Sequence, residues 1–225
     1  EEKKNHELSI KLYFAAGFVS KAVEIAIKTF NIEFLANFKD KIQTINDSKL
    51  ILHCAEYFEK AGNFIEAVNF FAYAKRIEKV EELCEKHQMK LSENLIDFLS
   101  SFQIEPVARL FEQQGQFLKA AQIYTNLNEY TKALKMLMKL NDIEKVVNFT
   151  ENIKNPLCYS ISADYIVDKF NPKRSSPLFQ IVIEFYRKSE NYEKIANFLK
   201  SRSKIEIETN QNYEKALELL KESQT

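Results

Sequence analysis

The sequence predicts an all-α protein, a solenoid of about fifteen short antiparallel helices. Two observations lead to this fold class. Glycine occurs at only three positions, and all three glycines precede the same apolar pattern. That pattern then returns at helical spacing along most of the 225 residues. Repetition of one helical unit is typical of a solenoid, in which each unit packs only on its neighbours.

The three glycines stand in equivalent settings, because a large apolar residue follows each by two positions and an alanine follows three further on. The first copy consists of Gly17, Val19 and Ala22, the second of Gly62, Phe64 and Ala67, and the third of Gly115, Phe117 and Ala120. Glycine ends a helix at low cost, since it adopts positive φ without a Cβ clash. We therefore expect the apolar residue to begin the next helix and the alanine to let a neighbouring helix lie close. This is the hairpin turn of an irregular tetratricopeptide-like α-solenoid.

The same pattern returns without glycine at five more places. They are Ile77/Val80, Tyr130/Ala133, Ile143/Val146, Tyr192/Ile195 and Tyr213/Ala216. Several copies continue with apolar residues at offsets of four and seven, which places them on one helical face. The copy at Ile77 has Glu81 instead, so we expect that helix to be more exposed. We expect Phe117 to be a core side chain whose replacement by alanine costs about 3–5 kcal/mol.

Other helix boundaries follow from capping residues. Asn155-Pro156 and Ser176-Pro177 each place a capping side chain before a proline at the first helical position. Ser92 is expected to open a helix that reaches Phe102. Residues 205–209 alternate like a strand, but a lone strand has nothing to pair with. We expect one solenoid segment over residues 1–225, cut from a longer protein, with an irregular polar link at 170–176.

The composition excludes several classes of function. The chain carries 32 basic and 32 acidic residues, and a net charge of zero argues against wholesale nucleic-acid binding. The longest apolar run falls short of the roughly 18–20 residues of a membrane span, so no direct membrane insertion is expected. Three widely spaced cysteines do not suggest a disulfide framework and fit a reducing compartment.

We find no constellation that predicts catalysis or metal binding. Cys84 and His87 lie three residues apart on a predicted helix, but zinc takes three or four converging ligands. The remaining cysteines and histidines are scattered along the chain: Cys54, Cys158, His6 and His53. No G-x-S-x-G motif occurs, and three separated glycines cannot form a phosphate loop. We therefore expect no enzyme activity, no catalytic residue, no metal site and no cofactor.

The link at residues 169–177 is locally basic, with Lys169, Lys173 and Arg174. It suits an acidic lipid or partner, or phosphorylation of Ser176. We favour a solvated loop whose Ser176 caps the next helix, because a lipid site takes about four to eight clustered basic residues.

The motifs and their order resemble a known family: the C-terminal tetratricopeptide-like region of the hundred-and-forty-kilodalton subunit of intraflagellar transport complex A. The resemblance covers nearly the whole chain, and the link around Pro172–Pro177 is more polar than the family pattern. It rests on Ala16–Ala26, Tyr57–Cys84, Gln114–Phe117, Tyr124–Leu140, Asn141–Val146, Ser162–Ile166, Ile183–Tyr186, Ile205–Glu208 and Gln211–Ala216.

The resemblance implies a non-enzymatic scaffold needed for complex assembly, retrograde ciliary transport and ciliary entry of membrane cargo. Its implied partners are the other subunits of complex A, together with membrane-protein cargo adaptors. The implied location is the cilium, the ciliary base and the cytoplasm. The resemblance assigns no partner-binding residue.

Two other interpretations stay open: a peptide-binding tetratricopeptide adaptor, with Lys, Arg and Asn converging on one face, and a vesicle-coat-type solenoid subunit. In every case a few aromatic or Arg anchors would supply most of the affinity. An exposed arginine is therefore the first candidate anchor. The arginines are Arg76, Arg109, Arg174, Arg187 and Arg202.

Overall fold

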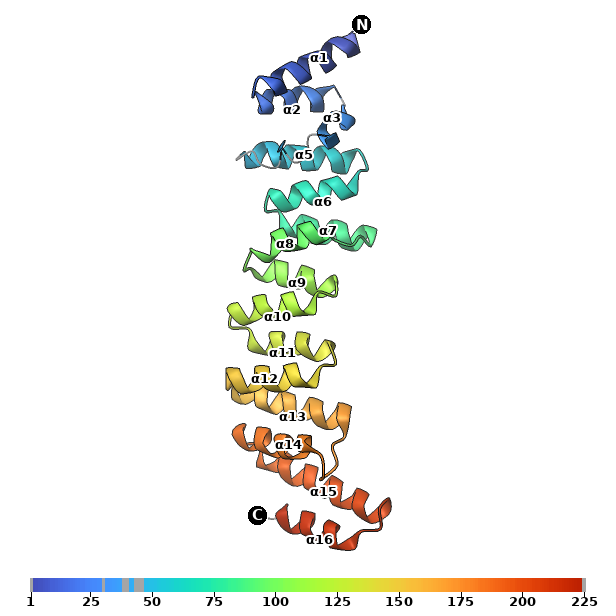
Figure 1. The fold of residues 1–225 in the computed structure, drawn as a ribbon, viewed down its shortest axis with the longest axis vertical. Coiled ribbons are helices and arrows are strands. Elements are labelled where there is room, and N and C mark those ends of the chain that lie inside the picture. The colour runs from blue at the N-terminus through green and yellow to red at the C-terminus, as the bar shows by residue number, and fades with distance from the viewer. Residues whose placement is uncertain (1, 30, 38–40, 43–46, 224–225) are drawn as a thin grey trace. The chain divides into compact units, whose positions relative to one another are not determined.

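The computed structural model describes residues 2–29, 31–37, 41–42 and 47–223. Within these residues the chain forms α-helices and no strand (Figure 1), which confirms the all-α, tetratricopeptide-like solenoid. None of the described helices combines the length and hydrophobicity that crossing a bilayer requires. The fifteen helices with described bounds are α1 (Glu2–Ala15), α2 (Val19–Lys28), α3 (Ile32–Asn37), α5 (Ser48–Lys60), α6 (Phe64–Tyr73), α7 (Ile77–His87), α8 (Glu93–Ser100), α9 (Glu105–Gln113), α10 (Phe117–Asn126), α11 (Tyr130–Lys139), α12 (Ile143–Ile153), α13 (Pro156–Phe170), α14 (Pro177–Lys188), α15 (Tyr192–Glu208) and α16 (Tyr213–Glu222).

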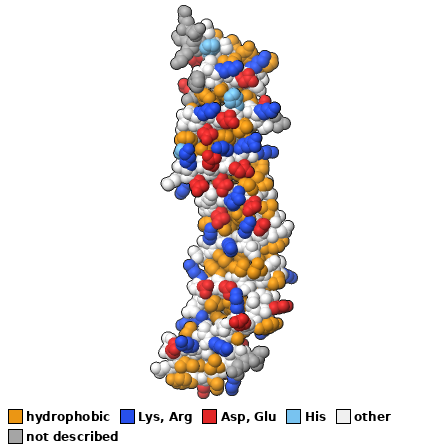
Figure 2. Space-filling view, turned by 180° about the vertical axis from the view of Figure 1, so that it is seen from behind, with side chains coloured by type: hydrophobic (Ala, Val, Ile, Leu, Met, Phe, Trp, Pro, Cys, Tyr) orange, Lys and Arg blue, Asp and Glu red, His pale blue; other side chains and the backbone are white. Residues whose placement is uncertain are grey.

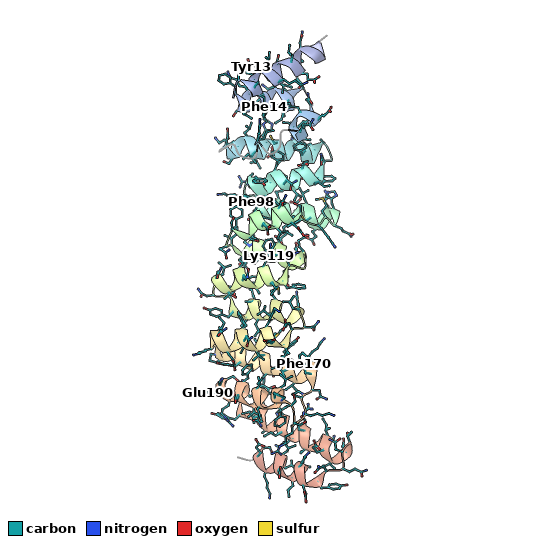
Figure 3. The ribbon with its side chains drawn as sticks, viewed as in Figure 1. Tyr13, Phe14, Phe98, Lys119, Phe170 and Glu190 are labelled. Carbon is teal, nitrogen blue, oxygen red and sulfur yellow. The ribbon has the colours of Figure 1, made fainter. Side chains whose placement is uncertain are left out.

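The chain divides into two compact units, Glu1–Leu110 and Phe111–Thr225. In the first unit α1 packs on α2, α5 on α6, and α6 on α7. In the second unit α10 packs on α11, α13 on α14, and α15 on α16. Figure 3 labels Phe170, at the end of α13, and Glu190, after α14. They lie on opposite sides of the helix stack, as successive antiparallel helices require. The single segment expected over residues 1–225 stays a prediction.

All eight copies of the apolar pattern begin a helix at the expected residue. These helices are α2, α6, α7, α10, α11, α12, α15 and α16. Two residues before each start the backbone has positive φ. Glycine supplies it three times, and five non-glycine residues supply it elsewhere: Lys75, Asn128, Asn141, Glu190 and Gln211. The sequence predicted the left-handed turn only at the glycines, so the structure extends one turn type to every copy.

A backbone hydrogen bond closes six of these turns in the same way. The residue after the left-handed position donates its N–H to the carbonyl five residues earlier, over 2.8–2.9 Å. This bond satisfies one of the carbonyls left unpaired at a helix end. The acceptor residue is aromatic in all six turns: Tyr13, Phe58, Phe71, Phe111, Tyr124 and Tyr186. All but Tyr13 are buried, so the turn and the core are fixed by the same residue.

The alanines of the pattern are buried, as expected. Their relative exposure is 2% or less at Ala22, Ala67, Ala120, Ala133 and Ala216. A methyl group at this position lets the neighbouring helix approach closely. In the second unit the core continues through aromatic and aliphatic side chains of α13, α14 and α15, including Phe179, Phe185 and Leu199.

One sequence expectation about exposure holds, and one about length is wrong. The α7 helix is more exposed than α6, because its Glu78, Lys79, Glu82, Glu85 and Lys86 are exposed, whereas Ile65 alone is exposed in α6. Glu81 itself is partly covered by Arg109 of α9, which lies 3.8 Å from its carboxylate. The helix opened by Ser92 ends at Ser100, so Phe102 lies beyond it. The Ser92 cap itself is confirmed, because its Oγ accepts from the N–H of Leu95.

The irregular link between α13 and α14 is tied to the helices around it. Ser176 caps α14 as expected, accepting from the N–H of Leu178 at 3.3 Å. Arg202 of α15 donates to the Asn171 side chain, and Arg174 lies 3.2 Å from Glu218 of α16. The expected solvated loop is therefore only partly correct. Residues 205–209, which alternate like a strand, form the last turn of α15 and the residue after it.

The left-handed turns generate a paired prediction. In Gly115→Ala the new Cβ meets no atom within 4 Å, so the change costs only backbone strain, about 1 kcal/mol of unfolding free energy. Glu190→Gly relieves the strain of φ 58° and stabilises by about 0.5–1 kcal/mol. Urea denaturation measures both. A shift in the same direction for the two variants would contradict a common left-handed turn.

Phe117 generates a second prediction, which corrects the sequence-based magnitude. Its ring is only half-buried, and Lys139 Nζ lies 5.3 Å from the ring centroid. Phe117→Ala should therefore cost about 1–2 kcal/mol. Phe111, with no exposed surface, is the matched comparison, and Phe111→Ala should cost about 3–5 kcal/mol. Equal losses in thermal or urea unfolding would show that Phe117 belongs to the core after all.

Candidate interaction surfaces

The cysteines and histidines considered for a metal site lie in the packed interior or apart from one another. The thiols of Cys54, Cys84 and Cys158 are buried, and burial raises the pKa of Cys54 to about 12 and that of Cys84 to about 11. His87 stacks on the ring of Phe64, with centroids 3.7 Å apart. In the described part of the chain, no three His, Cys, Asp or Glu residues are placed to hold a metal ion.

Three of the five arginines are engaged within the fold. They are Arg109, Arg174 and Arg202, whose partners are Glu81, Glu218 and Asn171. Arg202 is only 8% exposed, and its guanidinium lies 5.2 Å from the centre of the Phe198 ring. Burial lowers its pKa. Arg76 and Arg187 are exposed, and they are the arginines that remain as candidate anchors.

Arg187 lies beside a groove in the second unit, which we call the α14–α16 groove. The groove encloses about 480 Å³ and is lined by Ile183, Arg187, Tyr192, Ile195, Ala196, Leu199, Glu222 and Ser223. Its floor is apolar, because Ile183 and Leu199 are buried. Arg187 forms no ion pair within the described residues. A groove with an apolar floor, an exposed guanidinium and a tyrosine has the residue types that dominate protein interfaces.

Among the eight helices that begin with a residue of the apolar pattern, the first residue is exposed at Tyr192 and Tyr213 and at least partly buried in the other six. Phe64 begins α6 and is covered by His87, and Phe117 begins α10 and lies under Lys139. The covering side chain belongs in both cases to the end of the following helix. At Tyr192 the following helix ends in Glu222 and Ser223, and in the described part of the chain no ring or cation covers the tyrosine. Tyr192 is 64% exposed as a result.

A polar network ties α14 and α15, which carry most of the residues of this groove, to α13. Tyr186 Oη donates to Asp164 Oδ1 at 2.9 Å, and Lys194 Nζ donates to Asp164 Oδ2 at 2.6 Å. Lys194 and Asn191 also donate to Ser160 Oγ, each at 3.1 Å. Burial and the Asp164 carboxylate raise the pKa of Tyr186. Because the network joins α13, α14 and α15, the groove is formed before any partner arrives.

A second groove lies in the first unit, between α6 and the link that joins α7 to α8. We call it the α6–α8 groove. It encloses about 180 Å³ and is lined by Ile65, Val68, Asn69, Cys84, Met89, Lys90, Leu91, Ser92 and Leu95. Ile65 stands at its edge with 68% of its surface exposed.

Neither groove was predicted from the sequence. The sequence feature that could have indicated the α14–α16 groove is the tyrosine at the start of a helix, Tyr192. Tyr130 carries the same signal, yet it is half-buried and donates to Asn128. The distribution of charged residues did not indicate either groove, because basic and acidic side chains are interspersed over the face seen in Figure 2.

The comparison with known proteins identifies the domain type. A family model that describes the TPR domain of intraflagellar transport proteins 140 and 172 matches residues 1–185. This range contains the first unit and the second unit as far as α14, and α15 and α16 follow it. The matched family agrees with the resemblance seen in the sequence. The chain belongs to this family of intraflagellar transport TPR domains.

Proposed function

We propose that this chain is a non-enzymatic scaffold of intraflagellar transport complex A. In this role it binds other subunits of the complex, supports its assembly, and serves retrograde ciliary transport and the entry of membrane cargo. The family match, which covers residues 1–185, carries the proposal. The location that accompanies this role is the cilium, the ciliary base and the cytoplasm.

The surface supports a role in protein binding. A helical stack presents long edges, and binding energy at such edges comes from a few well-placed anchors surrounded by weaker contacts. The α14–α16 groove offers Tyr192 and Arg187 as anchors over the buried floor of Ile183 and Leu199. A partner helix with an apolar ridge and a carboxylate would fit this groove and pair with Arg187.

Complex A is the partner assembly that we favour within the family. The motifs from Phe111 to the C-terminus occur in the order of the complex A subunit, and they include the segments Ile205–Glu208 and Gln211–Ala216. These segments now have structural roles. The first lies in the last turn of α15, and the second leads through the left-handed Gln211 into α16.

Affinity purification from ciliated cells tests this proposal. The tagged chain should recover the other complex A subunits, measured by quantitative mass spectrometry. Changing Arg187 to Glu and Tyr192 to Ala together should reduce that recovery about tenfold or more, since each change removes a hot-spot side chain. Lys200→Glu is the matched control, because it reverses the charge of an exposed residue of α15 that does not line the groove.

The variants should keep the helix content and melting temperature of the wild type, since both side chains are exposed. Recovery of coat proteins, or of a single client without the complex A subunits, would refute the scaffold role. Undiminished recovery by the double variant would remove the α14–α16 groove from the interface while leaving the scaffold role standing.

A further inference from the structure

We infer that the α6–α8 groove is a second binding site, which holds a short acidic peptide of another protein by one large apolar side chain. Nothing in the scaffold role requires this site. The groove lies in the first unit and shares no residue with the α14–α16 groove.

The floor of the groove is apolar. Val68, Cys84, Leu91 and Leu95 are each 9% exposed or less. The groove opens to solvent, and its volume of about 180 Å³ is somewhat larger than the roughly 150 Å³ of apolar cavities that bind benzene. One leucine, methionine or phenylalanine side chain therefore fits. Ile65, exposed at the edge, would lose its contact with water when such a side chain enters.

The polar groups at the rim indicate what surrounds that side chain. Asn69 of α6 donates its Nδ2 to Glu66 at 3.3 Å, so its Oδ1 can accept a hydrogen bond from a peptide N–H. Lys90 is exposed and forms no ion pair within the described residues. It is also the only charged residue among the nine that line the groove. Charge complementarity therefore favours a carboxylate on the ligand, next to its apolar anchor.

The wall opposite α6 is fixed before binding. At one end Gln88 adopts left-handed φ of 50°, and the N–H of Met89 donates to the carbonyl of Cys84 at 3.0 Å. At the other end Ser92 caps α8. A wall held at both ends loses little conformational freedom when a ligand arrives, which preserves affinity for a short peptide.

The occupant that these features specify is a peptide segment. An inserted apolar side chain uses the floor, a backbone amide uses Asn69, and a neighbouring Asp or Glu uses Lys90. An anionic membrane would require a cluster of basic residues, and the groove has one.

Fluorescence anisotropy with the full chain tests the proposal. The probe is a fluorescein-labelled peptide in which one phenylalanine is flanked by two glutamates on each side. We expect saturable binding with a dissociation constant on the order of 10–100 μM. Replacing the phenylalanine of the probe by alanine, or its glutamates by lysines, should weaken binding at least about tenfold.

Matched variants locate the site. Lys90→Glu should weaken binding of the glutamate probe about tenfold or more and improve binding of the lysine probe. Lys60→Glu, an equivalent charge reversal at an exposed residue of α5, should change neither.

Three outcomes would overturn the inference: no saturable binding up to about 1 mM probe, equal binding of the phenylalanine and alanine probes, or an unchanged affinity in Lys90→Glu. Lys90→Glu should leave the recovery of complex A subunits intact. Failure of the peptide site is therefore distinguishable from failure of the scaffold role.

Discussion

The left-handed turn that joins successive helices is the constraint on which the rest of this structure depends. In six turns the residue after the left-handed position donates its N–H to the carbonyl of an aromatic residue five positions earlier. The aromatic ring is buried in five of them. One residue thus ends its helix and anchors it in the core, so the direction of the chain reverses at a fixed point. A helix of ten residues followed by a turn with one left-handed residue gives the 13-residue step between Phe117, Tyr130 and Ile143.

A repeating turn also fixes which residues stand at the edge of the stack. The residue that begins each helix occupies the same position in every copy, and in two copies a side chain at the end of the next helix covers it. His87 covers Phe64 and Lys139 lies over Phe117, whereas Glu222 and Ser223 leave Tyr192 open. The α14–α16 groove therefore lies where such a covering side chain is missing.

In the two proposed binding sites, charge is expected to act through single groups. With 32 basic and 32 acidic residues interspersed over the visible surface (Figure 2), the chain has no strong field to steer a partner over long distances. Arg187 and Lys90 are each the only cation that lines its groove, beside an apolar floor. In both proposals a partner would gain affinity from the buried apolar contact and specificity from a carboxylate that pairs with this cation.

The sequence by itself determined the helix starts and the buried alanines. It also determined the caps at Asn155 and Ser176, because these depend on φ preference, side-chain size and hydrogen bonds within a few residues. Only the tertiary structure decided that Glu81 is covered by Arg109, that Phe117 is half-buried and that Tyr192 is open. It also placed Lys75 and Glu190 in the left-handed region that local preference assigns to glycine. Each of these outcomes depends on the packing of side chains from neighbouring helices, and no local pattern in the sequence records which side chain arrives there.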